Sequence, residues 1–429
     1  MVEKIQAIRG MNDVLPSETR AWRNLEQAFI RCMHQYGYQE IRFPHVESTQ
    51  LFKRSIGEVT DIVEKEMYTF VDLNGDSITL RPEGTAGCLR ACLEHGLLHN
   101  QQQKLWYLGP MFRHEKPQKG RYRQFHQFGV EALGISGAAI EIELIALCRR
   151  LWKTLGIEQH VELQINTLGE LSERQNYRQH LIAYFKDRFE QLDEDSKRRL
   201  ERNPLRILDS KNPHMQELLR EAPQLMDFLG VDSKKCFNDL CEGLEQLGIP
   251  YTINPFLVRG LDYYGHTVFE WVTDKLGSQA TVCAGGRYDV LVEQLGGEAC
   301  PAVGFAMGEE RLLLLLETLN ISLNAESQFS LFIIATGDVA MQQALSLAEV
   351  LRNENSNWEV ITNTLGGSFK SQFKKADKSG AHLALILGED EVRESKIGIK
   401  NLRKHEDQVT IQQVDLIQYL HNYLEDSRS

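Results

Sequence analysis

The chain has 429 residues, of which 42% are hydrophobic and 25% are charged, and its formal net charge at pH 7 is -12. A single core rarely grows beyond about 250–300 residues, so this length predicts two or three globular domains. The negative charge argues against a non-specific nucleic-acid binder, although specific RNA binding needs only a local basic patch.

Nothing in the sequence predicts a membrane or secreted protein. The longest apolar run, residues 312–316, is too short to cross a bilayer, and the N-terminus lacks a basic-then-apolar signal pattern. Eight cysteines are present without a Cys-x-x-Cys pair, which is typical of reduced thiols. Cys88 and Cys92 fall on one helix face, but two soft ligands do not make a zinc site. We therefore expect a cytoplasmic protein without a protein-only metal site.

The first 133 residues predict one amphipathic helix followed by strands. In residues 17–35, apolar side chains recur at the spacing of 3.6 residues that a helix needs. Residues 40–43 alternate like a strand that Pro44 ends, and residues 67–80 resemble a hairpin that turns at Asn74-Gly75. Two further strands are expected at residues 104–112 and 124–133. The loop between them is basic, which fits either an RNA contact or a solvated loop; its basic residues are Arg113, Lys116, Lys119, Arg121 and Arg123.

The rest of the chain changes character twice. Residues 169–250 are rich in charge and interrupted by prolines, which predicts an inserted helical module. Strand and glycine character returns over residues 251–308, and a helix follows over residues 308–319. After a polar linker, strands alternate with helices from residue 329 to the end, which predicts a small, largely parallel α/β domain; its expected strands are residues 331–335, 358–362, 383–387 and 409–411.

Polar residues gather on the strand pair around the basic loop. On a strand, Gln127, Gly129 and Glu131 point to one face, and Arg113 and Glu115 share a face as well. A polar floor on otherwise apolar strands is costly unless something binds there. The alternative is a surface ion-pair ladder. No P-loop or dinucleotide-binding glycine pattern is present, so any nucleotide is bound without those loops.

Residues 112–131 resemble motif 2 of the class II aminoacyl-tRNA synthetases. Residues 17–44 resemble motif 1, the dimer-forming element, and residues 304–311 resemble motif 3. Three further stretches are similar to signatures of the histidyl-tRNA synthetase family: residues 79–85, 259–264 and 285–289. The resemblance covers essentially the whole chain.

The resemblance implies a fold and an activity. The expected fold is an α+β catalytic domain, an antiparallel sheet flanked by helices, over residues 1–325. A helical insertion over residues 169–250 interrupts it, and an anticodon-binding α/β domain occupies residues 329–429. The implied enzyme is a histidine–tRNA ligase that activates L-histidine with ATP to histidyl-adenylate and pyrophosphate. It then transfers histidine to the 3′ end of tRNA(His).

The family's roles for ATP carry over to matching positions. Arg113 and Arg259 are the expected catalytic residues, because each would approach the α-phosphate where it meets the histidine carboxylate. ATP would arrive as its Mg²⁺ complex, as substrate. The remaining ATP contacts implied by the resemblance are Arg311 and Arg121 at the γ-phosphate, Phe125 stacked on adenine and Glu115 at its amino group.

The histidine site is assigned in the same way. Glu131 and Tyr264 would read the two ring nitrogens of imidazole. Strand alternation places Tyr263 and Tyr264 on opposite faces, so only Tyr264 is expected to be a direct reader. The other expected histidine-binding residues are Glu83, Thr85 and Gln127 at the α-amino group, Arg113 and Arg259 at the carboxylate, and Tyr263 and Tyr288 at the pocket.

Gln118 and Arg123 are the candidate tRNA contacts in the loop, and motif 1 implies a homodimer. Lys370, Lys374, Lys375 and Lys378 form a basic cluster that fits either phosphate contacts or a solvated face.

Two residues depart from the family pattern: Glu309, where many relatives carry an apolar residue, and Val290, where a glycine is common. Neither has an assigned role.

Three rival functions remain to be weighed. A catalytically inactive paralogue that regulates another enzyme would typically lack the C-terminal domain and signature residues, which this chain keeps. A class II ligase for threonine, proline or glycine would not carry the two histidine-type signatures at residues 259–264 and 285–289. A pure RNA-binding protein would leave the polar floor unexplained.

Overall fold

The structure is a computed structural model that describes residues 4–57, 60, 62–208, 210, 212–258, 263–277, 280–323 and 329–428. The chain divides into two compact units, Met1–Leu323 and Asn324–Ser429. In the described part of the chain, no helix is both long and apolar enough to cross a membrane.

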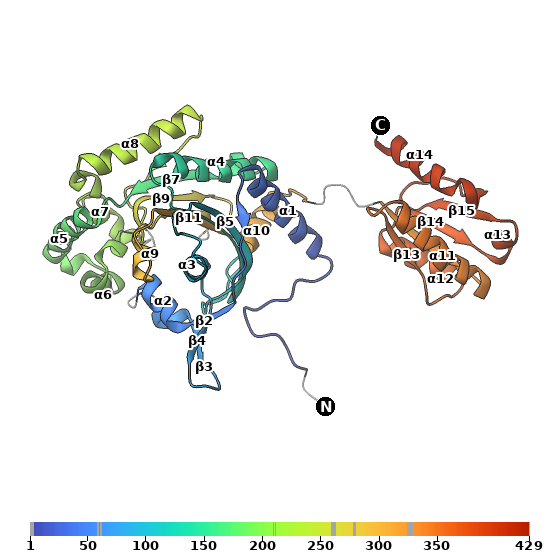
Figure 1. The fold of residues 1–429 in the computed structure, drawn as a ribbon, viewed down its shortest axis with the longest axis horizontal. Helices are drawn as coiled ribbons and strands as arrows, with labels where there is room; N and C mark the ends of the chain where they lie inside the picture. Colours follow the sequence, from blue (N-terminus) through green and yellow to red (C-terminus); the bar gives the residue numbers. More distant parts are fainter. Residues whose placement is uncertain are drawn as a thin grey trace. The chain divides into compact units, whose positions relative to one another are not determined.

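An eight-stranded sheet forms the centre of the first unit (Figure 1). Its six middle strands pair antiparallel, and a short strand is added in parallel at each edge. The predicted α+β class is therefore confirmed. In sheet order the strands are β1 (Gln39–Glu40), β5 (Gln103–Phe112), β6 (Gln124–Leu133), β11 (Ala302–Gly308), β10 (Thr281–Arg287), β9 (Gly265–Val272), β7 (Glu162–Thr167) and β8 (Thr252–Ile253).

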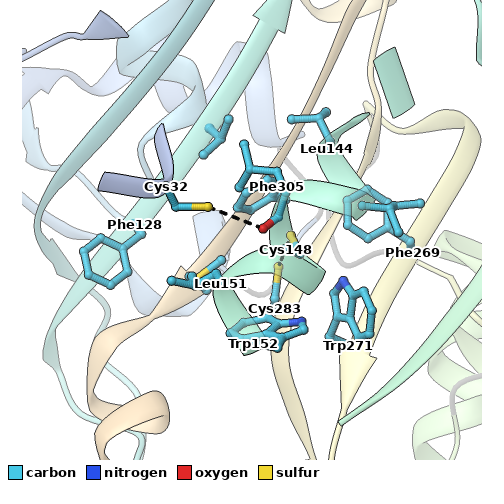
Figure 2. Packing of buried hydrophobic residues seen from close by; sticks show 14 of the residues in the cluster. Cys32, Phe128, Leu144, Cys148, Leu151, Trp152, Phe269, Trp271, Cys283 and Phe305 are labelled. Atoms are coloured by element: carbon cyan, nitrogen blue, oxygen red, sulfur yellow. Dashed lines mark hydrogen bonds between the residues drawn. The ribbon is translucent and has the colours of Figure 1, made fainter. Parts of the chain in front are cut away.

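Helices cover one face of this sheet. They are α1 (Thr19–Gln35), α4 (Ala138–Leu155), α8 (Val231–Gln246) and α10 (Glu309–Thr318). Alternate strand residues, such as Phe128, Val130 and Phe305, point into the core beneath them. Figure 2 shows this packing, in which the thiols of Cys148 and Cys283 lie 3.8 Å apart. Predicted helix 17–35 is thus confirmed with its apolar stripe buried.

The other face carries a second core. Helices α3 (Thr85–Glu94) and α9 (Val290–Gln294) pack there, and Figure 1 shows α3 on the opposite side of the sheet from α4. The predicted hairpin is present as β3 (Tyr68–Val71) and β4 (Ser77–Leu80), and β2 (Val46–Ser48) completes a three-stranded sheet beside α2 (Thr49–Ile56).

The predicted helical stretch contains α5 (Leu171–Asp187), α6 (Glu194–Arg202) and α7 (Gln216–Arg220), joined by short 3-10 turns. Their apolar side chains join the second core. The last helix of the stretch, α8, instead buries Phe237, Leu240 and Leu244 in the first core, against α4. The stretch therefore contributes to both faces of the sheet.

The second unit has its own five-stranded sheet and cores. The prediction of a largely parallel sheet was only partly right, because β12, β13 and β14 are parallel but β15 and β16 run antiparallel. The strand β15 was not predicted. Its elements are β12 (Ser330–Ala335), α11 (Asp338–Glu354), β13 (Glu359–Thr362), α12 (Phe369–Ser379), β14 (Leu383–Leu387), α13 (Glu389–Arg393), β15 (Lys396–Asn401), β16 (Val409–Gln412) and α14 (Leu416–Arg428).

Two details of the predicted strands were wrong. The strand expected at residues 40–43 is only the two-residue β1, because Pro44 and the turn to β2 follow closely. Arg113 and Glu115 do not share a strand face, since β5 ends at Phe112 and both residues lie in the loop beyond it.

Candidate active site

Small residues open a cavity over the sheet. Along β11 the larger Phe305 and Met307 point into the helix-covered core, whereas Ala306 and Gly308 lie on the opposite face. Ala284 of β10 lies on the same floor. Because these side chains are so short, a cavity of about 320 Å³ remains above them.

Ten of the predicted site residues line this cavity, from four separate stretches of chain. Such convergence is what a binding site requires and a surface ion-pair ladder does not. The ten are Glu83, Thr85, Arg113, Glu115, Arg121, Phe125, Gln127, Tyr263, Tyr264 and Arg311.

Arginines dominate one end of the cavity. Arg113 donates to the carbonyl oxygen of Pro82 at 2.8 Å, and its guanidinium lies 5.4 Å from the centre of the Phe125 ring. Arg121 forms an ion pair with Glu115, whose carboxylate also lies 4.0 Å from Arg113. The loop thus holds two guanidinium groups around one buried carboxylate.

Arg311 reaches the same end from α10. It donates to the carbonyl oxygens of Thr281 at 2.8 Å and Gly120 at 3.3 Å. Burial lowers its pKa from the usual arginine value, and repulsion from Arg121 and Arg113 adds to the effect. Positive charges from two segments, the loop after β5 and helix α10, therefore concentrate where a polyanion would be stabilised.

Acceptors occupy the other end. Glu83 is buried, and it accepts from the backbone N–H groups of Thr85 at 2.6 Å and Ala86 at 3.0 Å, at the start of α3. Burial raises the pKa of Glu83, and these hydrogen bonds oppose that rise. Gln127 lines the cavity with a buried Oε1 atom that has no hydrogen-bond partner in the part of the chain described. An unpaired buried acceptor is costly, so a ligand donor fits there.

Glu131 and Tyr288 lie behind the cavity wall rather than on it. Glu131 is 1% exposed, and its carboxylate accepts from the hydroxyl groups of Thr85 at 2.8 Å, Tyr107 at 3.1 Å and Tyr288. Burial raises the pKa of Glu131 to about 8, although the hydroxyl donors oppose that rise. Thr85 connects this buried carboxylate to the cavity, because it lines the cavity and donates to Glu131.

Both Tyr263 and Tyr264 line the cavity, so the argument from strand alternation was wrong. The two residues precede β9, which begins at Gly265, and alternation does not apply outside a strand. Their rings are 4.7 Å apart, and Tyr288 packs 5.6 Å from Tyr263.

Two other predicted residues, Gln118 and Arg123, do not line the cavity. Arg259 lies outside the described residues, as do the next three positions of its signature. Gln118 exchanges backbone hydrogen bonds with Arg121 at the tip of the loop. Arg123 braces that loop, since its Nε donates to the carbonyl oxygen of Glu115 at 3.1 Å. The four lysines of the C-terminal cluster are exposed on or beside α12, at Lys370, Lys374, Lys375 and Lys378.

Sequence reasoning missed several residues at the site. Glu270, Tyr122 and Glu310 line the cavity. Glu310 directly precedes the motif 3 arginine, and it accepts from the backbone N–H of His126 at 2.9 Å, so its position in the motif was a usable signal.

A second cavity, of about 920 Å³, borders the helical stretch and shares Glu270 and Thr281 with the first. It is lined by none of the residues predicted from sequence.

Within the described ranges, no group of three or more His, Cys, Asp or Glu side chains is arranged to hold a metal ion. All eight cysteines are free. Among the described residues, the predicted arginines and buried acceptors meet at the cavity over β10 and β11.

Comparisons with known proteins identify the family of this chain. A family model of histidyl-tRNA synthetases matches residues 10–312, and one of the anticodon-binding domain matches residues 330–423. Histidine–tRNA ligases from two strains of Legionella pneumophila, Lens and Paris, are each 68% identical over 424 residues, which is 99% of this chain and 100% of theirs.

Solved structures are similar as well. The apo histidyl-tRNA synthetase of S. aureus is 38% identical, with a TM-score of 0.81 over 97% of this chain and 99% of its own. A histidyl-tRNA synthetase from Nostoc sp. PCC 7120 shares the fold, with a TM-score of 0.71 at 21% identity over 98% of this chain and all of its own. The chain is thus an aminoacyl-tRNA ligase for histidine, and it belongs to the histidyl-tRNA synthetase family.

Proposed function

We propose that the cavity over β10 and β11 is the site where histidine reacts with ATP, and that its residues hold the roles given by the family motifs. One observation carries the proposal: Arg113 and Arg311 converge on a cavity that also contains the unpaired acceptor Gln127. A cationic end and an acceptor end suit a reaction that joins a polyanion to an amino acid.

In the first step, the histidine carboxylate attacks the α-phosphorus of ATP, and pyrophosphate leaves. Two anions must approach each other, so fixed cations at the developing charge lower the barrier. Arg113 bridges the carboxylate and the α-phosphate, and Arg259 reaches the phosphate from the other side. Arg311 and Arg121 bind the γ-phosphate. Phe125 stacks on adenine, and Glu115 accepts from its amino group.

ATP enters as its Mg²⁺ complex. Glu270 and Glu310 line the cavity, and their carboxylates are the kind of oxygen ligand that Mg²⁺ prefers. The metal would neutralise phosphate charge, while the protein side chains orient the phosphates.

Histidine binds at the acceptor end. Glu83, Thr85 and Gln127 hold the α-ammonium group, which offers three N–H donors. Glu131 and Tyr264 read the imidazole nitrogens. A site that hydrogen-bonds its substrate rejects analogues lacking those groups by about 10⁴–10⁵-fold, so selection needs no separate hydrolytic domain.

The second step transfers histidine to tRNA. Gln118 and Arg123 lie in the loop next to the cationic end, and they are the proposed contacts with the acceptor stem. The second unit binds the anticodon, with the exposed lysines of α12 as phosphate contacts.

The working enzyme is a homodimer of the cytoplasm. Exposed apolar residues in the N-terminal segment support self-association, since Ile5 is 100% and Ile8 63% exposed. Eight free thiols suit a reducing compartment. Light scattering of the purified chain tests the dimer, and a mass near 49.2 kDa would contradict it.

Amino-acid-dependent exchange of pyrophosphate into ATP tests the site. Histidine alone among the twenty amino acids should support exchange. Arg113→Ala should lower the rate by about 10²–10³-fold, as loss of one preorganised donor does elsewhere. The matched control is Arg198→Ala, because Arg198 is 76% exposed and does not line the cavity. Equal rates for both variants would remove Arg113 from the mechanism.

A further inference from the structure

Tyr107 is a buried tyrosine that no motif accounts for. It lies on β5 and is 2% exposed, and its hydroxyl donates to Glu131 Oε1 at 3.1 Å. A buried tyrosine usually needs a partner for its hydroxyl group. The partner here is the carboxylate proposed to read the substrate ring.

Two glycines make the room for this ring. Gly129 is the direct neighbour of Tyr107 in the β5–β6 register, and a Cβ atom there would lie 2.0 Å from Tyr107 Cζ. A Cβ atom at Gly84 would lie 2.1 Å from Tyr107 Cε2. The ring of Tyr107 therefore lies across the adjacent strand β6. A residue larger than glycine at position 84 or 129 would occupy the space of this ring.

A glycine on the adjacent strand makes room for Glu131 as well. Gly304 is its neighbour in the β6–β11 register, and a Cβ atom there would lie 2.0 Å from Glu131 Oε2. Both side chains thus extend sideways across a glycine of the adjacent strand. Such packing leaves the tyrosine hydroxyl and the carboxylate little freedom to reorient.

Hydroxyl donors occupy most of the acceptor positions of the Glu131 carboxylate. A carboxylate offers about four lone-pair positions, two on each oxygen. Thr85 and Tyr107 donate to Oε1, and Tyr288 donates to Oε2. With Oε1 saturated, a single position remains, and it belongs to Oε2.

We infer that Tyr107 is a positioning residue for histidine selection: its hydroxyl occupies the last acceptor position of Glu131 Oε1, so that only Oε2 can accept the imidazole N–H. The inference rests on the proposed function, in which Glu131 reads the ring. It assigns specificity to a side chain that does not itself line the cavity.

Tyr107→Phe tests the inference, because phenylalanine keeps the ring in place and removes only the donor. The Michaelis constant for histidine in pyrophosphate exchange should rise about tenfold or more, as expected for a lost bond to a charged group. The constant for ATP should stay within about twofold. Loss of one donor should also move the acidic limb of the pH profile of kcat/KM for histidine to higher pH, since hydrogen bonds to a carboxylate favour its ionised form.

The matched control is Tyr38→Phe. Tyr38 is equally buried, and its hydroxyl donates to the carboxylate of Glu143 at 3.0 Å, away from the cavity. The control variant should lose a similar amount of thermal stability and keep both constants. If Tyr107→Phe also keeps both, or raises them equally, the inference is overturned.

Glu131→Gln separates this inference from the proposed function. If Glu131→Gln raises the histidine constant and Tyr107→Phe does not, Tyr107 has no positioning role but the site assignment stands. If Glu131→Gln leaves the histidine constant unchanged, the assignment of Glu131 as reader fails, and the role of Tyr107 fails with it.

Discussion

Replacing Glu309 by glutamine should make the protein more stable at neutral pH and leave its stability unchanged in acid. Glu309 is the first residue of α10 and is completely buried. Among the described residues, neither oxygen of its carboxyl group has a hydrogen-bond partner. Burial raises its pKa from 4.5 to about 9, and the nearby carboxylates of Glu26 and Glu310 add to the rise.

The size of the expected gain in stability follows from the proton that Glu309 must keep in the folded state. Above pH 4.5 the unfolded state releases the proton of Glu309, whereas the folded state keeps it until about pH 9, so folding grows less favourable between those limits. At pH 7 the solution is about 2.5 pH units above the unfolded-state pKa of 4.5. Keeping Glu309 protonated in the folded state therefore costs about 1.36 kcal/mol for each unit, or roughly 3 kcal/mol. The helix dipole favours a negative charge at this position by only about 0.3–1 kcal/mol, so desolvation dominates.

Glutamine is nearly isosteric and carries no proton to lose, so Glu309→Gln should remove this dependence. Urea unfolding at pH 5 and pH 8 measures it. The variant should gain less than about 1 kcal/mol over the parent at pH 5 and about 4–5 kcal/mol at pH 8.

Glu317→Gln on the same helix is the control, since Glu317 is 73% exposed and should show no such trend. A gain for Glu309→Gln that is equal at both pH values would refute the reasoning.

Two further substitutions probe other contacts. Glu141→Gln should lower the free energy of unfolding by about 1.5–3 kcal/mol, because Arg287, whose Nε lies 2.5 Å from Glu141 Oε1, then keeps only the partly exposed carboxylate of Asp289 at 3.1 Å. An unchanged urea midpoint would contradict this. Gln127→Ala should raise the histidine constant in pyrophosphate exchange at least tenfold and leave that for ATP nearly unchanged, and an equal rise in both would argue against its contact with the α-ammonium group.

Much of the sheet and of the site could be predicted because the relevant signals are local. Alternation along residues 124–133 correctly placed Phe128 and Val130 opposite Gln127 and Glu131. The motif segments carried the arginines, and ten of the predicted residues do line one cavity.

What escaped prediction depends on neighbouring strands and loops. Tyr107 acquires its position from Gly129 across the β5–β6 register, and a single sequence does not state which residues of two strands lie opposite. Tyr263 and Tyr264 were treated as a strand pair although their strand begins one residue later. Glu131 was expected on the cavity wall, but it lies behind that wall, where three hydroxyl groups donate to its carboxylate.

The crowding of Arg113, Arg121 and Arg311 has a consequence for the lifetime of the protein. Glu115 offsets part of their mutual repulsion, and the rest, which contributes to the lowered pKa of Arg311, is a cost that the folded chain carries until a further anion binds between them. A nucleotide bound in the proposed site would remove that cost and stabilise the folded state by an amount that rises with the logarithm of its concentration relative to Kd. When nucleotide supply falls, more of the protein unfolds transiently and becomes accessible to proteases, so the abundance of this ligase would follow the energy state of the cell.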